Sequence, residues 1–409
     1  MLGAALLAPR IVAAQAAGPV APAPAPAGDS PPPSDESKPG DAAPAPAVPP
    51  AERVPANSEA NRPPPEPVAP STGFSWQPFG FIRLQYIAIQ ADPNVGYIGR
   101  DDGFELQNAR VGARGKLGNI AAFVLSFDGA VDQRTQINSP QGNIAVGLRD
   151  AYVDARIAGD VTGRGGYFQA LVDPEAQIPD TSREFVDKPI ETRGVLPTQG
   201  YQTPGLPPGR SIGAAIRLDP EVPTTGAKFG FEVAAQNGAD EFSSNNDNNS
   251  LALSATALLR LPHDSWLVAS GRYNPRTIGA LPFRQDETDY QGAFGAHLGL
   301  GPVSLGGGIV IEHTTFDTTG GPAQDAYGAH VQAMVRIPAS LPVAIGYRFG
   351  ILDPSSLITT DRVIEHTVGA VLGVPRLRMR FQLQLTHVDE QAGRELENDR
   401  AQLAAEVSL

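Results

Sequence analysis

The chain has 409 residues, of which 18% are charged and 41% are hydrophobic, and its formal net charge at pH 7 is −13. The absence of cysteine excludes disulfide scaffolds, Cys-ligated metal sites and thiol nucleophiles. The acidic balance argues against a nucleic-acid partner, because proteins that bind phosphate backbones usually carry a basic surplus. The sequence has no apolar run long enough for a membrane-spanning helix. A membrane-spanning β-barrel is not excluded, since in its strands apolar residues alternate with polar ones.

The N-terminal part is expected to direct export of the chain and to connect it to the folded part, and not to fold itself. Residues 1–17 contain a short apolar stretch followed by Ala14, Gln15 and Ala16, a small-residue pattern typical of a secretory signal peptide, with a cytoplasmic leader as the alternative. Residues 18–71 are rich in proline and alanine and cannot bury enough apolar surface to fold. We therefore expect a disordered linker there, either inert or in contact with the cell wall.

From Phe74 onward, apolar and polar residues alternate with a period of two, which is typical of strands. In one segment Leu377, Met379 and Phe381 alternate with Arg378 and Arg380. Such segments are predicted to begin near residues 79, 104, 120, 146, 163, 210, 227, 250, 265, 289, 303, 326, 342, 363, 376 and 399. The pattern predicts an all-β fold over residues 72–409, a sixteen-stranded antiparallel transmembrane β-barrel.

The links between these segments alternate in length. Short links are predicted at 118–119, 158–161, 219–226, 262–264, 301–302, 338–341 and 374–375, and each lies between two long polar links. Outer-membrane barrels have short periplasmic turns and longer external loops, whereas a soluble sandwich has no reason to sort its loops in this way. The alternation therefore indicates the outer membrane of a Gram-negative bacterium, with lipid as the barrel's surroundings.

The block 104–213 resembles the phosphate-selective porin O and P family. The resemblance rests on Leu148-Arg149-Asp150-Ala151-Tyr152-Val153-Asp154, on Gly166-Tyr167-Phe168-Gln169, and on Glu175, Phe185, Arg193, Gly209, Arg210 and Gly213. It implies a water-filled sixteen-stranded channel, usually a homotrimer, that passes small hydrophilic solutes and in some members favours phosphate. Gln169 stands where that family often has Lys, and the chain has only four lysines, which weakens the implied phosphate preference.

If the apolar residues of each strand face lipid, the polar residues that alternate with them line a polar lumen. This places more cations than carboxylates on the lumen wall and predicts an anion-attracting path, unless the arginines pair with wall carboxylates such as Asp150 and Asp154. The predicted pore-lining residues are Arg83, Arg110, Arg114, Arg156, Arg217, Arg272, Arg348, Arg378 and Arg380. Further charges of that parity are Arg260, Arg336, Lys116, Lys228, Asp128, Glu232, Glu312 and Glu406.

The link at 172–209 is much longer than its neighbours, and loops of that length are usually functional. It is the third predicted external loop, and in porins such a loop folds inward and narrows the channel. Its predicted constriction residues are Asp173, Glu175, Arg183, Lys188 and Arg193. Carboxylates predominate in its first half, opposite to the wall, and these charges also suit internal salt bridges that pin the loop.

No catalytic, metal or cofactor site is predicted, since the six histidines are scattered and lack metal-ligand spacing. His387 with Asp389 has the elements of an oriented imidazole, but no recognisable nucleophile accompanies it. The function predicted is passive diffusion of small hydrophilic solutes, anions and phosphate among them. The alternatives are a structural or adhesive barrel with a blocked lumen and a barrel-borne hydrolase.

Overall fold

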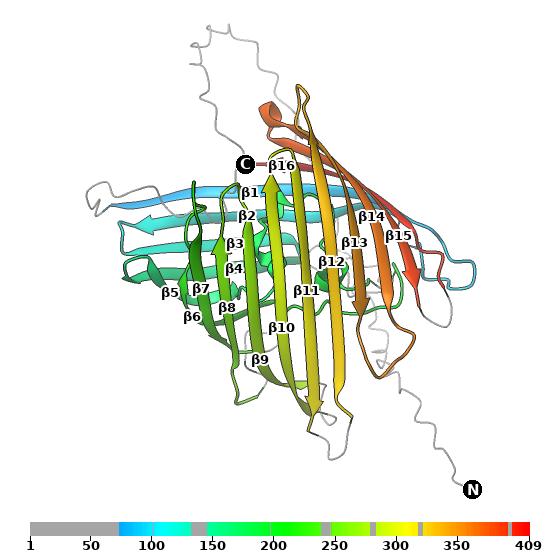
Figure 1. The fold of residues 1–409 in the computed structure, drawn as a ribbon, viewed down its shortest axis with the longest axis horizontal. Helices are drawn as coiled ribbons and strands as arrows, with labels where there is room; N and C mark the ends of the chain where they lie inside the picture. The colour runs from blue at the N-terminus through cyan, green and yellow to red at the C-terminus, as the bar shows by residue number, and fades with distance from the viewer. Residues whose placement is uncertain are drawn as a thin grey trace, which may run out of the picture. The chain divides into compact units, whose positions relative to one another are not determined.

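The structure is a computed structural model that describes residues 73–100, 102–131, 145–196, 198–238, 246, 248–278, 284–317, 322–391 and 395–409. The predicted signal peptide (1–17) and linker (18–71) lie outside these residues. Within them the chain forms one closed antiparallel barrel, in which each strand pairs with its neighbours in sequence and β1 pairs with β16 (Figure 1). The predicted fold class is confirmed for the barrel.

The sixteen strands begin within about five residues of their predicted positions. They are β1 (Phe74–Ile89), β2 (Gly103–Leu117), β3 (Ala121–Val131), β4 (Ala145–Ala158), β5 (Val161–Gln169), β6 (Arg210–Leu218), β7 (Lys228–Gln236), β8 (Ala252–Arg260), β9 (Trp266–Ile278), β10 (Gln285–Leu300), β11 (Val303–Phe316), β12 (Gln324–Ile337), β13 (Val343–Asp353), β14 (Val363–Val374), β15 (Met379–Glu390) and β16 (Arg400–Ser408).

Two strand starts differ from prediction for physical reasons. β1 begins at Phe74 and includes Pro78, because β1 pairs with β16 only from Phe81 onward, so the missing N–H of Pro78 lies on an unpaired side. β15 begins at Met379 instead of near 376. Pro375–Leu377 form a 3₁₀ turn, and Arg378 has a positive φ of 51°. The prediction that Arg378 lies on a strand is therefore wrong.

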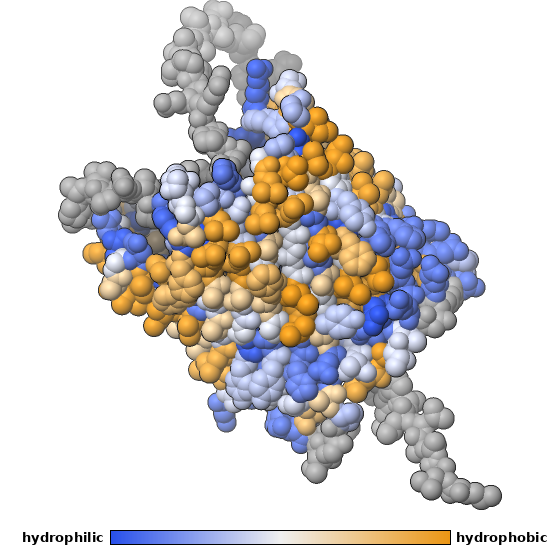
Figure 2. Space-filling view, viewed as in Figure 1, coloured by the Kyte–Doolittle hydropathy of each residue, from blue (hydrophilic) through white to orange (hydrophobic). Residues whose placement is uncertain are grey.

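The barrel is apolar outside and polar inside, the reverse of a soluble protein. On β1, Ile82, Leu84 and Tyr86 are exposed on the outer face, whereas Arg83 and Gln85 are buried on the inner face. Figure 2 shows orange apolar side chains spread across the outer face, with blue polar side chains gathered at its lower and right-hand margins. A charge at the lipid midplane costs about 2–4 kcal/mol, so this sorting suits a wall between hydrocarbon and a hydrated interior.

The links also alternate as predicted. Turns such as those at Gly118 and Gly301, where φ is 52° and 72°, connect strands at one end of the barrel. The long links at 90–102, 170–209, 237–251 and 354–362 connect strands at the other end. We call these the short-link end and the long-link end. No helix in the described part of the chain has the length and hydropathy of a membrane span.

Candidate pore and constriction loop

The link between β5 and β6 folds into the barrel and contains three short helical turns: η1 (Pro174–Gln177), η2 (Asp180–Ser182) and α1 (Ile190–Arg193). Asp173 caps η1 by accepting the N–H of Glu175 at 2.9 Å. Gly194 ends α1 with φ of 72°, a left-handed conformation that favours glycine. These local signals break the link into turns that follow the curved inner wall.

Wall side chains hold this loop mainly by its backbone. Ser270 donates to the carbonyl of Val172 at 2.7 Å, Gln382 donates to that of Arg183 at 3.0 Å, and Arg348 donates to that of Asp187 at 3.0 Å. Further bonds come from Arg83, Gln107, Thr256, Gln291, Ser304, Arg380, Gln384 and Asn398. The loop is thus fixed to β1, β2 and many strands between β8 and β15.

Apolar contacts reinforce the docking. Ile190 of α1 packs in one buried cluster with Leu352, Val363 and Val388, which face inward from β13, β14 and β15. Gly328 on β12 lies under Glu191, where an added Cβ would overlap the Cβ of that residue. Some inner-face positions are therefore apolar or glycine because the loop covers them.

The five predicted constriction residues all lie in this docked loop. Arg183 bonds to Asp180 at 2.7 Å, Lys188 lies 3.7 Å from Asp173, and Arg193 pairs with Glu365 of β14. Glu175 lies near the ring of His330 on β12, with Oε1 3.6 Å from Nε2. The predicted salt bridging of loop to wall is present, and it joins Arg193 to Glu365 and Asp180 to Arg110.

Burial and neighbouring charges shift the pKa values of the loop groups in different directions. Burial raises the pKa of Asp173, and Lys188 offsets only part of that effect. Burial alone would also raise the pKa of Asp180, but Arg183, Arg149 and Arg110 hold it well below its usual value of 3.8. Burial lowers the pKa of Lys188 from 10.5. Asp180 is therefore the strongly ionised anchor of the loop.

Eight of the nine predicted pore-lining arginines are on strands and have the inward parity. Arg83 and Arg380 both pair with Glu406, and Arg348 lies 4.6 Å from the ring centre of Phe185 in the loop. Arg110 pairs with Asp150 and Asp180, and Arg217 pairs with Asp219. Arg114 stacks over Phe79, and Arg156 and Arg272 lie on the inward parity of β4 and β9. Arg378 lies in a turn at the short-link end.

Most of the wall charges are thus neutralised in pairs. Arg210 bonds to Asp150 at 3.0 Å, and Arg276 bonds to Glu287 at 2.6 Å. Other inner pairs are Arg164–Asp154, Arg217–Glu232, Arg260–Asp219 and Arg400–Glu365. An excess of arginine on the wall is therefore a poor guide to the field inside the barrel, because paired charges largely cancel.

The predicted list omitted five inward arginines: Arg149, Arg164, Arg210, Arg276 and Arg400. Alternation does not place Arg149 on the inner face, because β3 and β4 shift register between Ser126 and Phe127, which forms a bulge at Arg149 next to Asp150. Its charge acts on Asp180 of the loop together with those of Arg183 and Arg110. Arg164 lies 3.8 Å from the ring centre of Tyr152. The resemblance block contained Arg149 and Arg210, but period-two counting alone does not find a bulge.

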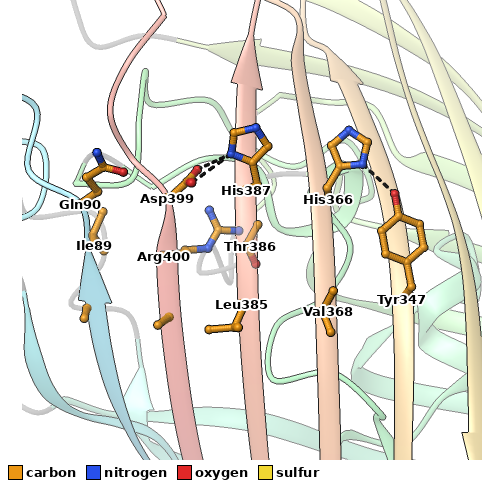
Figure 3. Close-up of a pocket in the computed structure, with 12 residues that line it drawn as sticks. Ile89, Gln90, Tyr347, His366, Val368, Leu385, Thr386, His387, Asp399 and Arg400 are labelled. Atoms are coloured by element: carbon orange, nitrogen blue, oxygen red, sulfur yellow. Dashed lines mark hydrogen bonds and ion pairs between the residues drawn. The ribbon is translucent and has the colours of Figure 1, made fainter.

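His387 lies on the outer face of β15, away from the lumen, with Nδ1 2.8 Å from Asp399 (Figure 3). Asp389, its predicted partner, lies 3.3 Å from Nε2. Within the described part of the chain, the hydrogen bonds of His387 go to carboxylates and none goes to a Ser or Thr hydroxyl. The geometry therefore supplies an oriented imidazole without the nucleophile that the hydrolase hypothesis requires.

Comparison with known proteins shows the fold. No family model matches the chain, and no curated protein matches it. The outer membrane channel DcaP of Acinetobacter baumannii is 14% identical, with a TM-score of 0.56 over 83% of this chain and 98% of that one. The anion-selective porin from Comamonas acidovorans is also 14% identical, with a TM-score of 0.55 over 82% of this chain and 100% of that one.

A trimer form of OmpT, an outer membrane protein of Vibrio cholerae, is 10% identical, with a TM-score of 0.56 over 82% of this chain and 99% of that one. These structural neighbours are outer-membrane β-barrel proteins of Gram-negative bacteria, porins among them. The resemblance to the phosphate-selective porin O and P family stays a prediction. The chain has the sixteen-stranded barrel fold of outer-membrane porins.

Proposed function

We propose that this chain is an outer-membrane porin through which small hydrophilic solutes diffuse passively, with the loop 172–209 as its constriction. The observation that carries the proposal is the docking of this loop on the inner wall of the barrel by backbone-directed bonds from Arg348, Gln382 and Ser270. A sixteen-stranded barrel is wide enough to leave an aqueous path beside such a loop. The long-link end is then external and the short-link end periplasmic.

Within the predicted lining, we assign two roles. Arg83, Arg348 and Arg380 hold the loop, because each donates to a loop carbonyl. The water-facing wall is assigned to Arg114, Arg156 and Arg272 on β2, β4 and β9, whereas Arg110 and Arg217 are held in ion pairs with Asp150 and Asp180 and with Asp219.

The sign of selectivity follows from the charges where the loop meets β2, β4 and β6. Arg110, Arg149, Arg183 and Arg210 gather there around Asp150 and Asp180, so cations outnumber carboxylates. A local surplus of guanidinium groups concentrates anions. We infer a modest preference for anions, phosphate among them, and the anion-selective neighbour has a similar barrel.

Three chains are expected to assemble as a homotrimer through the apolar outer face of the barrel, as the trimer form of OmpT suggests. On β2–β4 this face presents Phe104, Val111, Leu125, Leu148 and Val153. Analytical ultracentrifugation in detergent tests the assembly, and a monomer at all concentrations would contradict it.

Planar-bilayer recording of the purified protein tests the function. Discrete conductance steps with a reversal potential on the anion side in a salt gradient are expected. The blocked-lumen alternative has one observation in its favour, because Asp187 of the loop meets both Gln107 of β2 and Arg348 of β13. Purified protein that never opens a conducting step would establish that alternative.

A further inference from the structure

A shallow depression of about 630 Å³ lies on the outer face of the barrel, over β13–β16 and β1. Its floor is apolar, and Ala88 of β1 faces Ala401 of β16 in register. These two small side chains leave space beside the larger Leu385 and Val368. Figure 3 shows Leu385 and Val368 on the strands below a row of polar side chains.

The polar row lies at the long-link end of the depression. The hydroxyl of Tyr347 is 2.6 Å from Nδ1 of His366, and Nδ1 of His387 is 2.8 Å from Asp399. The two histidines are register partners with stacked rings. Tyr347 belongs to the row itself, and Tyr86 of β1 and Phe104 of β2 form an edge-to-face pair on the outer face toward the same, long-link end. Aromatic belts mark the boundary between hydrocarbon and head groups, so the row stands at head-group depth.

The row is rich in hydrogen-bond acceptors. Asp389 lies beside the depression rather than in its lining and contacts both rings, with Oδ1 3.3 Å from Nε2 of His387 and Oδ2 3.6 Å from Nε2 of His366. The carboxylates of Asp389 and Asp399 remain nearly half exposed, at 43% and 47%. Arg400 also borders the depression, but its guanidinium turns inward to Glu365. No compensating Lys or Arg group faces these carboxylates from the residues that line the depression.

We propose that this depression binds the saccharide head group of a membrane glycolipid, with an acyl chain over Ala88 and Ala401. Sugar hydroxyls, and the ammonium of an amino sugar, donate to Asp389 and Asp399. A bare phosphate head group would meet two carboxylates of like charge, and an acyl chain alone would leave the acceptors without donors. The inference rests on the proposed outer-membrane placement, which sets the depression in the external leaflet.

A second His–Asp pair on the outer face provides a matched control. Nδ1 of His313 on β11 lies 2.6 Å from Asp325 on β12, beside Tyr290. The outward neighbours there are Ile309, Ile311 and Val331, which are bulky. This pair therefore has the polar chemistry of the row without the alanine floor.

The test is native mass spectrometry of the full-length protein in detergent. The probes are an acylated glucosamine disaccharide with its phosphates, the same disaccharide without them, and phosphatidylethanolamine with matched chains. Both disaccharides are expected to bind in preference to the phospholipid. Asp389→Asn with Asp399→Asn is expected to weaken disaccharide binding about tenfold or more, because both charged acceptors become neutral amides.

Ala88→Phe, which fills the floor, is expected to weaken binding similarly, and Asp325→Asn is expected to leave it unchanged. Equal binding by all variants overturns the proposal. So does equal affinity for phosphatidylethanolamine, or disaccharide binding that needs both the phosphates and added Mg²⁺, which would indicate a cation-bridged phosphate. Conductance is recorded in parallel. A conducting protein without glycolipid preference refutes this site alone, whereas a glycolipid-binding protein that never conducts refutes the channel alone.

Discussion

The side-chain oxygen of Gln384 on β15 accepts the backbone N–H groups of Val186 and Asp187 in the loop, at 3.0 and 3.3 Å. Gln384 is fully buried, and its Nε2 donates to Gln402 and Thr386. The wall thus holds the loop by its main chain, through an amide that its neighbours keep in place.

Replacing Gln384 by alanine is expected to loosen the loop, because two backbone donors lose their acceptor and a buried unsatisfied donor costs about 1–3 kcal/mol. Single-channel recordings should show more current noise and more frequent brief closures. Gln332→Ala is the matched control, since Gln332 faces inward from β12 beside Gly306. Equal noise in both variants would show that Gln384 does not position the loop.

A side chain at Gly328 is expected to displace α1, because its Cβ would overlap Glu191. Gly328→Val should make the loop cleave faster in limited proteolysis while the barrel keeps its resistance to unfolding in detergent. Gly165→Val provides the comparison, since an added Cβ there meets no atom within 4 Å. If both variants were cleaved at the wild-type rate, α1 would not depend on contact with β12.

Selectivity should respond to the charges at the junction of loop and wall. Arg149→Gln is expected to shift the reversal potential toward cations and Asp150→Asn toward anions. One unit charge at about 4 Å in water is worth about 1 kcal/mol, or roughly a fivefold change in permeability ratio. Arg378→Gln should cause no shift, because Arg378 lies in a turn. Shifts of the same sign in the first two variants would refute the electrostatic assignment.

Loop docking is expected to survive mild acid. The pKa of Asp180 is depressed in the docked loop, so its contribution is present above about pH 4 and is lost only as the pH falls through that lowered pKa. The pKa of Asp173 is raised, so Asp173 takes up a proton first and its protonation favours the docked state. Closure frequency should therefore not rise between pH 7 and pH 5.

Asp173→Asn should remove any decrease in closures over that range, and Asp180→Asn should raise closures at every pH. A wild-type channel that closes progressively from pH 7 to pH 5 would contradict the assignment of Asp180 as the ionised anchor.

A charged side chain on the outer face should destabilise the barrel. Leu383→Arg is expected to lower the free energy of unfolding in bilayers by about 2–4 kcal/mol, because Leu383 is 46% exposed on the lipid-facing side of β15. Denaturant titration in lipid vesicles measures this, with Leu383→Met as the conservative control. Equal stability of the two variants would mean that Leu383 does not face hydrocarbon.

Period-two alternation was sufficient to predict the sixteen strands and the parity of residues such as Arg83 and Glu406, because one side of each strand meets a different solvent from the other. It could not reveal the bulge at Arg149, which adds a residue to one strand without changing the composition. Nor could it explain Leu352, Val363 and Val388, whose apolar side chains face inward because Ile190 covers them.

The partner of each charged residue also could not be predicted by counting charges along the sequence. Whether Arg380 presents a charge to solutes or bonds to Glu406 and the carbonyl of Arg183 depends on where the loop lies. The loop's position in turn depends on contacts between residues far apart in sequence, such as those between Arg83 and Asp180 and between Asn398 and Gln199, which are 97 and 199 residues apart. Spacing along the chain contains no signal for these partners.

Ion conduction by the purified protein in a planar bilayer tests the account most directly. The account predicts discrete conductance steps and, in a salt gradient, a reversal potential that favours anions and moves toward cations in Arg149→Gln. A protein that inserts as a folded barrel but never conducts, or that conducts with a cation preference, would contradict it.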